Sequence, residues 1–358
     1  MKKLIFLLFL LFPLKVGAIS ASSSIVMDLD NGRILYQNNI HDERLIASIT
    51  KIMTAIVTIE YADLDKIVEV GDEILEAYGS AIYIELGEKL TLRDLLYGLM
   101  LRSGNDAAVV IAKNVAGSMD NFAMMMNEMA SKIGMKNTYF YNAHGLEEED
   151  GSGNTSTAYD MALLTKYAMT NSEFRKIFGT RKYTVKTNYK TYTWISKNKL
   201  VHNYDFITGG KTGFTEKARR TLVTTGSNNN INLVVVTLND PNDFQDHLTL
   251  YEQIFRDYEA VKVIDKDKFG VKQDNVYKED TLYVLDSIYV PVTKEEKKKL
   301  RIEYELYKNN TYIDGDRVGS VIVYLDDELL RKEGIYVMVQ EKTEKLSWWE
   351  RLLRWIKW

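Results

Sequence analysis

Hydrophobic and polar positions follow two different patterns along this chain. From residue 24 to about 258, short strand-like runs are mixed with longer runs whose apolar residues recur at helical spacing. These runs predict helices at about 45–60, 91–101, 106–116, 120–133, 157–170 and 246–257, and strands at 24–29, 33–36, 219–226 and 231–238. The pattern therefore indicates an α+β domain over residues 19–260, in which a sheet is flanked by helices.

Helices nearly vanish from residue 261 onward. Residues 300–307 alternate between apolar and polar side chains, and further strand-like runs occur at 281–292, 318–324 and 334–340. We therefore expect a second, all-β domain over residues 261–344, which is a size within the usual domain range.

The first 18 residues are typical of a signal peptide. Lys2 and Lys3 precede an apolar run at 4–14, and Val16-Gly17-Ala18 supplies small residues where a signal peptidase cuts. The apolar run is shorter than the roughly 20 residues that a membrane-spanning helix needs. We expect export and cleavage, and an uncleaved signal anchor is the alternative.

The last stretch, residues 345–358, has the pattern of an amphipathic helix. One face carries Leu346, Trp349, Leu352, Leu353 and Ile356 and is widened by Trp348 and Trp355, while the opposite face carries Ser347, Glu350, Arg351, Arg354 and Lys357. Tryptophan favours the headgroup boundary, and basic residues favour anionic lipid. The pattern predicts a helix that lies on the membrane surface, although a helix docked on its own domain would share these features.

Charge and composition restrict the possible chemistry. The 358 residues include 46 Lys plus Arg against 50 Asp plus Glu, and a net charge of -4 gives no electrostatic reason to expect nucleic acid as a partner. The chain has no cysteine, which excludes disulfides and thiolate chemistry. The four histidines are too scattered to suggest a metal site, and no glycine-rich phosphate loop occurs, so no metal or cofactor is predicted.

One charged side chain stands out in the predicted helix at 45–60. Lys51 is the only charge across residues 45–59, so we expect a buried amine whose pKa is lowered. Ser48 lies one helical turn earlier, within reach of that amine, which makes it a candidate nucleophile beside a base. A helix-capping serine with a solvated lysine is the alternative, and Ser196 with Lys199 repeats the same spacing in a polar run.

Two further short motifs offer polar groups at constrained positions. Ser103-Gly104-Asn105 forms a predicted turn between two apolar helices, which would hold its side chains rigidly. Lys211-Thr212-Gly213, followed by Phe214 and Thr215, alternates like a strand and offers a cation and hydroxyls to a carboxylate. An ordinary turn and an ordinary edge strand are the alternatives.

Together, S-x-x-K, S-x-N and K-T-G occur in the order found in class A β-lactamases and penicillin-binding proteins. The surrounding sequence resembles most closely the low-molecular-mass penicillin-binding proteins that are serine-type D-alanyl-D-alanine carboxypeptidases. The resemblance covers residues 22–258 well and the β domain loosely, and it is carried mainly by residues 47–55, 95–108, 144–146, 156–160 and 211–215. It implies a catalytic domain of the penicillin-binding protein/β-lactamase type.

The resemblance also implies a role for each matching residue. Ser48 would be the acylated nucleophile, Lys51 its general base and Ser103 a proton relay, and the substrate would be held by Asn105, Lys211, Thr212, Gly213, Phe214 and Thr215. By similarity, the backbone N–H groups of Ser48 and Phe214 would form the oxyanion hole. One departure is that the loop at 240–243 lacks the arginine with which some members bind the substrate carboxylate, so Thr212, Thr215, Arg219 or Arg220 would have to serve.

The resemblance implies a hydrolase that removes the terminal D-alanine from peptidoglycan stem pentapeptides through an acyl-serine and is inhibited by β-lactams. Such an enzyme would act in cell-wall biogenesis on the outer face of the cytoplasmic membrane, held there by its C-terminal helix. A β-lactamase or DD-endopeptidase with the same residues is one alternative, and a catalytically idle penicillin-binding scaffold is another. Glu147, Glu148 and Glu149 resemble a solvated acidic loop rather than the extra base of a β-lactamase.

Overall fold

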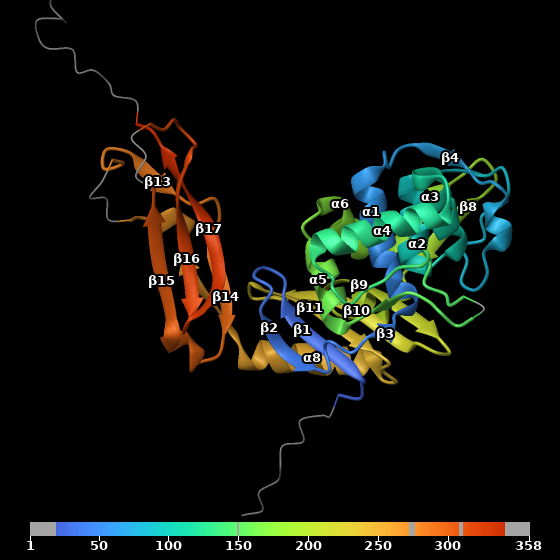
Figure 1. The fold of residues 1–358 in the computed structure, drawn as a ribbon, viewed down its shortest axis with the longest axis horizontal. Coiled ribbons are helices and arrows are strands. Elements are labelled where there is room, and N and C mark those ends of the chain that lie inside the picture. The colour runs from blue at the N-terminus through green and yellow to red at the C-terminus, as the bar shows by residue number, and fades with distance from the viewer. Residues whose placement is uncertain (1–18, 149, 272–275, 308–310, 341–358) are drawn as a thin grey trace, which may run out of the picture. The chain divides into compact units, whose positions relative to one another are not determined.

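The computed structural model describes residues 19–148, 150–271, 276–307 and 311–340 of the chain (Figure 1). The chain forms two compact units, Met1–Asp257 and Tyr258–Trp358. The predicted signal peptide and the predicted C-terminal helix both lie outside the described residues.

The first unit is built on a five-stranded antiparallel sheet. Its order is β2-β1-β11-β10-β9, which places β9 at an edge. The central strands are almost completely buried, and this explains their continuous apolar runs. The strands are β1 (Ser23–Asp28), β2 (Ile34–Asn38), β9 (Ile207–Thr215), β10 (Arg219–Asn228) and β11 (Ile231–Leu238).

Helices cover both faces of this sheet, so the predicted α+β arrangement is confirmed (Figure 1). Helix α8 packs against β10 and β11, and α5 packs against β1 and β11 within the cluster that contains most of the helical core. The helices are α1 (Lys51–Tyr61), α2 (Leu92–Arg102), α3 (Asn105–Ala116), α4 (Met119–Ile133), α5 (Ala158–Ala168), α6 (Ser172–Phe178), α7 (Lys199–Asn203) and α8 (Asp243–Asp257).

The predicted helix at 45–60 is wrong at its start. Leu45 pairs with Thr155 in a short strand ladder, and Ala47 has a left-handed backbone with φ 49°. A 3₁₀ turn, Ala47–Thr50, then leads into α1 at Lys51. The pairing with a distant strand overrides the local helical pattern, so Ser48 lies in the turn before the helix.

Several small elements were not predicted. They are the helices α6 and α7 and three two-stranded ladders, β3 (Arg44–Leu45) with β6 (Thr155–Ser156), β4 (Ile67–Glu69) with β5 (Lys89–Thr91), and β7 (Lys182–Lys186) with β8 (Thr191–Ile195). These elements are short, so their hydrophobic periodicity is weak.

The second unit is all-β in its described part, apart from two 3₁₀ turns. A four-stranded sheet has the order β13-β17-β16-β15, and β12 pairs with β14. Its core is separate and consists largely of valine and isoleucine side chains. The strands are β12 (Glu259–Ile264), β13 (Thr281–Tyr283), β14 (Ile288–Val292), β15 (Leu300–Leu306), β16 (Arg317–Leu325) and β17 (Glu328–Met338).

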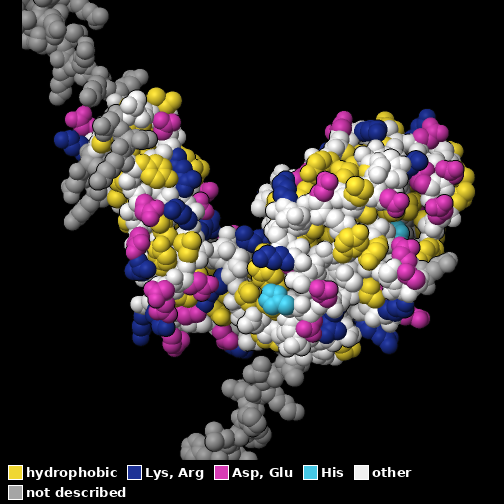
Figure 2. Space-filling view, in the orientation of Figure 1, with side chains coloured by type: hydrophobic (Ala, Val, Ile, Leu, Met, Phe, Trp, Pro, Cys, Tyr) yellow, Lys and Arg dark blue, Asp and Glu magenta, His cyan; other side chains and the backbone are white. Residues whose placement is uncertain are grey.

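On the face drawn in Figure 2, basic and acidic side chains are interspersed on the described surface. This distribution agrees with the nearly balanced charge of the sequence. No helix among the described residues is long and apolar enough to cross a lipid bilayer.

Candidate active site

Ser48 lies in the 3₁₀ turn between β3 and α1, and several contacts fix that turn. Gly145, with φ 86°, approaches so closely that a Cβ there would lie 2.1 Å from the carbonyl oxygen of Ala47. The hydroxyl of Thr221, on β10, donates to the carbonyl of Ile46 at 3.0 Å. The turn is therefore held between the loop at 144–146 and the sheet, and the position of Ser48 does not depend on local helix propensity.

Three oxygen atoms surround the amine of Lys51, which is fully buried. Nζ lies 2.7 Å from Asn105 Oδ1, 2.5 Å from the carbonyl oxygen of His144 and 3.1 Å from Ser48 Oγ. Because an amide oxygen and a carbonyl oxygen only accept, they use two N–H groups of the amine. A neutral amine then has one lone pair left, and the Ser48 hydroxyl can donate its proton to it.

The surroundings of Lys51 favour this neutral form. Burial, followed by the positive charges of Lys211 and Lys197, holds the pKa of Lys51 well below its ordinary value. Asp106 acts in the opposite direction and does not offset these effects. A pKa lowered in this way favours the neutral amine that a general base requires.

Ser103 and Asn105 come from the junction of two helices. Helix α2 ends at Ser103, whose backbone is left-handed with φ 65°, and α3 begins at Asn105. A left-handed serine is strained, and such strain is characteristic of positions held by tertiary contacts. The Asn105 side-chain amide donates to the carbonyl of Tyr78 at 2.6 Å, which directs its oxygen toward Lys51.

Asp106, the second residue of α3, stabilises this junction. Its carboxylate is buried and accepts hydrogen bonds from the backbone N–H groups of Ile82 and Tyr83 at 2.8–3.0 Å. The loop at 78–84 is thereby tied to α3, and the same loop contacts Asn105 through Tyr78 and Ser80. Burial raises the pKa of Asp106, while these backbone hydrogen bonds oppose the rise.

The K-T-G segment lies on edge strand β9. Lys211 is buried, and its Nζ donates to Ser103 Oγ at 3.0 Å and to the carbonyl of Thr212 at 2.6 Å. Burial, and then the charge of Lys197, lowers the pKa of Lys211 to about 7. Lys211 is thus poised between a cation and a neutral amine near neutral pH.

Gly213 brings β9 against the Ser48 turn. A Cβ at this position would lie 3.0 Å from the backbone nitrogen of Ser48, 3.1 Å from that of Ile49 and 2.4 Å from Thr221 Oγ1. Any side chain there would push the strand away from Ser48. The backbone of Gly213 is not left-handed. The close approach of β9 to the Ser48 turn therefore explains why this position is a glycine.

The remaining residues of the segment differ in their surroundings. Thr212 is partly exposed, and the Phe214 side chain is 58% exposed. The Thr215 hydroxyl donates to Glu147 and accepts from the backbone N–H of Ala218 at 3.0 Å. Glu147 therefore has a fixed hydroxyl partner, so the expectation of a purely solvated acidic loop is wrong at this residue.

Sequence reasoning missed Lys197. It belongs to the polar run next to Ser196, yet its Nζ donates to Ser80 Oγ at 3.1 Å and its charge lowers the pKa values of both Lys51 and Lys211. Lys199, the partner of Ser196 in the second S-x-x-K match, is exposed. The only sequence signal was the two lysines in this short polar run, and that signal does not show where a side chain lies in the folded protein.

His144 contributes its backbone to the site. Its carbonyl accepts from Lys51, and its ring Nδ1 accepts from the N–H of Leu146 at 3.1 Å. Burial, and then the charge of Lys51, lowers the pKa of the His144 ring to about 3. The ring is neutral at physiological pH, and its Nδ1 is already occupied.

The two arginines named as possible carboxylate ligands have different surroundings. Arg220 is bound to both carboxylate oxygens of Asp243 at 2.8 and 2.9 Å. Arg219 is exposed and lies opposite Thr215 in the β9–β10 register. Cross-strand neighbours share a face of the sheet, so Arg219 lies on the face of β9 that also carries Lys211.

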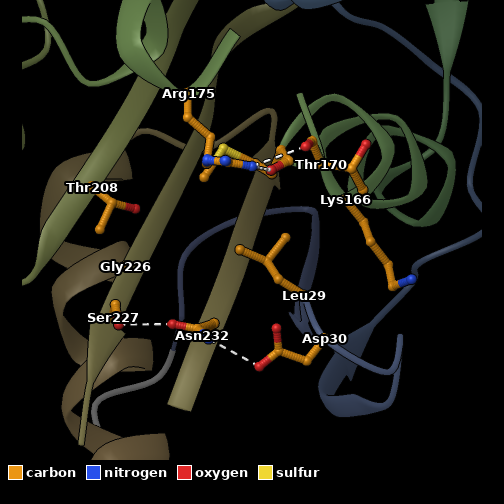
Figure 3. A pocket seen from close by; sticks show the side chains of 10 residues that line it. Leu29, Asp30, Lys166, Thr170, Arg175, Thr208, Gly226, Ser227 and Asn232 are labelled. Atoms are coloured by element: carbon orange, nitrogen blue, oxygen red, sulfur yellow. Dashed lines mark hydrogen bonds between the residues drawn. The ribbon is translucent and has the colours of Figure 1, made fainter. Parts of the chain in front are cut away.

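A separate cavity of about 550 Å³ contains none of the predicted site residues (Figure 3). Its polar groups are bonded to one another, since Ser227 donates to Asn232, Asn232 donates to Asp30, and Arg175 donates to two backbone carbonyls. No cluster of three or more potential metal-ligating side chains occurs among the described residues. The chemistry is therefore concentrated around Ser48.

The arrangement around Ser48 combines a hydroxyl, an amine whose pKa is lowered and a second amine that can hold an anion when it is protonated. The structure brings Ser48, Lys51, Ser103, Asn105 and Lys211 together, and Gly213 packs beside them. This combination suits acyl transfer, in which the hydroxyl attacks a carbonyl while the amine takes its proton.

Comparison with known proteins shows the family to which the chain belongs. Residues 13–242 match the family model described as D-alanyl-D-alanine carboxypeptidase, and residues 258–345 match the model of the penicillin-binding protein 5 C-terminal domain. The D-alanyl-D-alanine carboxypeptidase DacF of Bacillus subtilis is 34% identical over 222 residues, which are 60% of this chain and 56% of that relative. DacC of Escherichia coli is 29% identical over 343 residues, 90% of this chain and 84% of that relative.

Solved structures agree with these matches over both units. Penicillin-binding protein 5 of Haemophilus influenzae has a TM-score of 0.70 and 26% identity, with 89% of this chain and 97% of that chain covered. Penicillin-binding protein 6B of Escherichia coli has a TM-score of 0.68 and 26% identity, with 90% and 96% covered. The chain belongs to the D-alanyl-D-alanine carboxypeptidase family, the serine-type low-molecular-mass penicillin-binding proteins.

Proposed function

We propose that this chain removes the terminal D-alanine from peptidoglycan stem pentapeptides, with Ser48 as the nucleophile and Lys51 as its base. The observation that carries the assignment is the set of contacts around Lys51 Nζ, where two acceptors use its N–H groups and Ser48 Oγ is the third neighbour. Neutral Lys51 takes the hydroxyl proton as Ser48 Oγ bonds to the carbonyl carbon of the penultimate D-alanine.

Collapse of the tetrahedral intermediate breaks the peptide C–N bond. The leaving amine of D-alanine takes a proton through Ser103, whose Oγ lies 3.0 Å from Lys211 Nζ. Water then attacks the acyl-serine, and proton return to Ser48 restores the free enzyme. By similarity, the backbone N–H groups of Ser48 and Phe214 stabilise the oxyanion in both halves of the reaction, and the close approach at Gly213 supports this role.

The edge position of β9 supports a binding mode for the peptide. An extended stem peptide can pair with the unpartnered edge of the strand, while Asn105 binds its amide. Lys211 and the partly exposed hydroxyl of Thr212 can then bind the terminal carboxylate, whereas the Thr215 hydroxyl already donates to Glu147. β-Lactams occupy the same site and acylate Ser48.

The alternatives receive less support from the site. A β-lactamase needs a base placed for rapid hydrolysis of the acyl-enzyme, whereas Glu147 is held by Thr215 and Tyr78. An idle scaffold would not need Lys51 buried beside a hydroxyl.

For location, we propose export with loss of residues 1–18 and peripheral binding to the outer face of the cytoplasmic membrane through residues 345–358.

Penicillin should acylate Ser48 and no other serine. Ser48→Ala should abolish the adduct, and Lys51→Ala should slow acylation by about 10²-fold or more, because the hydroxyl then lacks its base. Peptide mapping by mass spectrometry locates the adduct, and release of D-alanine from a D-Ala-D-Ala peptide measures turnover. Ser196→Ala, in the second S-x-x-K match, is the matched control and should acylate normally. Normal acylation of Lys51→Ala would contradict the assignment of the base.

The pH profile of kcat/KM should be bell-shaped. Activity falls as the pH drops through the pKa of Lys51, because a protonated amine cannot accept the serine proton. It also falls as the pH rises through the pKa of Lys211, near 7, because the cation that holds the carboxylate is lost. Lys197→Gln should move both limbs to higher pH by roughly half a unit, since one positive charge no longer lowers either pKa. Lys199→Gln is the matched control, and an equal shift there would rule out a specific effect of Lys197.

Arg219 and Arg220 should behave differently when each is changed to glutamine. Arg219→Gln should raise KM about tenfold with little change in kcat, because a charge-assisted contact to the substrate carboxylate is lost. Arg220→Gln should leave KM unchanged and lower the melting temperature, because Asp243 then stays buried without its partner. Steady-state kinetics and thermal unfolding of both variants test the assignment, and an unchanged KM for Arg219→Gln would contradict it.

Deletion of residues 345–358 should release the enzyme from anionic vesicles without reducing its activity. The basic residues of this segment meet anionic headgroups, so that part of the binding should weaken with salt, whereas the tryptophan part should not. Changing Arg351, Arg354 and Lys357 to glutamine should remove only the salt-sensitive part. Cosedimentation with vesicles measures both effects, and vesicle binding by the truncated protein would place the anchor elsewhere.

A further inference from the structure

The N-terminal end of the described chain contacts a pair of carboxylates that the reaction does not use. The Ser20 backbone N–H donates to Asp246 at 2.6 Å, and its hydroxyl lies 2.7 Å from Asp246 Oδ2 and 3.0 Å from Asp240 Oδ1. Asp240 follows β11, and Asp246 lies in the first turn of α8. Ser20 thus bridges two acidic side chains more than 200 residues away.

Both carboxylates are buried, and one of them is incompletely bonded. Asp240 is 0% exposed and Asp246 is 6% exposed. Asp240 Oδ2 has no hydrogen-bond partner among the described residues, although it is shielded from solvent. Burial, together with the nearby charge of Asp246, raises the pKa of Asp240 to about 6. A buried pair of like charges is unfavourable unless one carboxyl group is protonated or a cation compensates for the charge.

The neighbouring groups do not supply that cation. The ion pairs among the described residues include neither carboxylate, whereas the adjacent Asp243 binds Arg220. His247, next to Asp246, is fully buried between the hydroxyls of Thr224 and Thr237. Burial lowers the pKa of its ring to about 3, so His247 is neutral. The acidic pair therefore has hydroxyl and N–H donors but no positive partner within the described part of the chain.

We propose that Asp240 and Asp246 form a binding site for the α-ammonium group that signal-peptide cleavage creates at Ile19. The inference rests on the proposed cleavage after Ala18. Ile19 precedes Ser20 directly, and because consecutive Cα atoms lie about 3.8 Å apart, its nitrogen is within reach of the carboxylates that hold Ser20. Cleavage then replaces an uncharged peptide N–H by a cation beside two buried anions, and the processed chain becomes more stable than its precursor.

The test compares two chains that differ only at the N-terminus. One begins at Ile19 with a free amine, and the other carries Gly-Ser before Ile19, which moves the ammonium two residues away. The extension should lower the melting temperature by about 3 °C or more. This loss should shrink to near zero when Asp240 and Asp246 are both changed to asparagine. Asp257→Asn, at the other end of α8 and exposed to solvent, is the matched control and should leave the loss unchanged.

A second measurement separates charge from packing. NMR titration of the isotopically methylated α-amine of the chain that begins at Ile19 should give a pKa above the ordinary value of about 7.7–8.0. It should return to that value in Asp240→Asn with Asp246→Asn. An ordinary pKa in the wild-type chain, an equal loss of melting temperature in all variants, or an exported protein that does not begin at Ile19 would overturn the proposal. The D-alanine release assay should be equal for both chains, so failure of the carboxypeptidase assignment is detected separately.

Discussion

The buried amine of Lys51 is the constraint on which the site depends. A lysine nitrogen without bulk water must either lose its charge or find anionic partners, and here its nearest neighbours are two neutral acceptors and a hydroxyl. That environment favours the neutral amine that a base next to Ser48 requires. The same environment would be unfavourable for stability alone, so the fold surrounding Lys51 has to be rigid enough to keep it buried.

The rigidity comes from contacts between elements that are distant in sequence. Gly145 holds the Ser48 turn from one side, Gly213 lets β9 approach from another, and Asp106 ties the loop at 78–84 over Asn105. The left-handed backbones at Ala47 and Ser103 are the local consequence of these contacts. Strain at these two residues is tolerated because neighbouring elements fix both positions.

Local sequence patterns predicted the parts of the structure that depend on local interactions. The predicted helix at 91–101 matches α2, whose start is fixed by the local hydrogen bonds between Thr91 and Asp94. The three-residue spacing of Ser48 and Lys51 predicted their contact, although Ser48 lies in a 3₁₀ turn. The start of α1 was predicted wrongly from the local pattern, because Leu45 pairs with a strand 110 residues later. Family resemblance placed Lys211 and Ser103 in the site but did not predict their contact with each other. Lys197 was missed, since loop packing places it beside the site.

The first unit treats buried charge differently in the basic cluster around Lys51 and in the acidic pair of Asp240 and Asp246. Around Lys51, desolvation and further positive charges nearby lower the pKa of the amine, which favours its neutral form. Around Asp240 and Asp246, the fold brings two acids together and surrounds them with donors that carry no full charge. An amine made neutral in this way can accept a proton, whereas paired carboxylates retain a strong attraction for a cation. The first arrangement therefore suits catalysis, and the second suits binding of the charged chain terminus that the proposed cleavage would create.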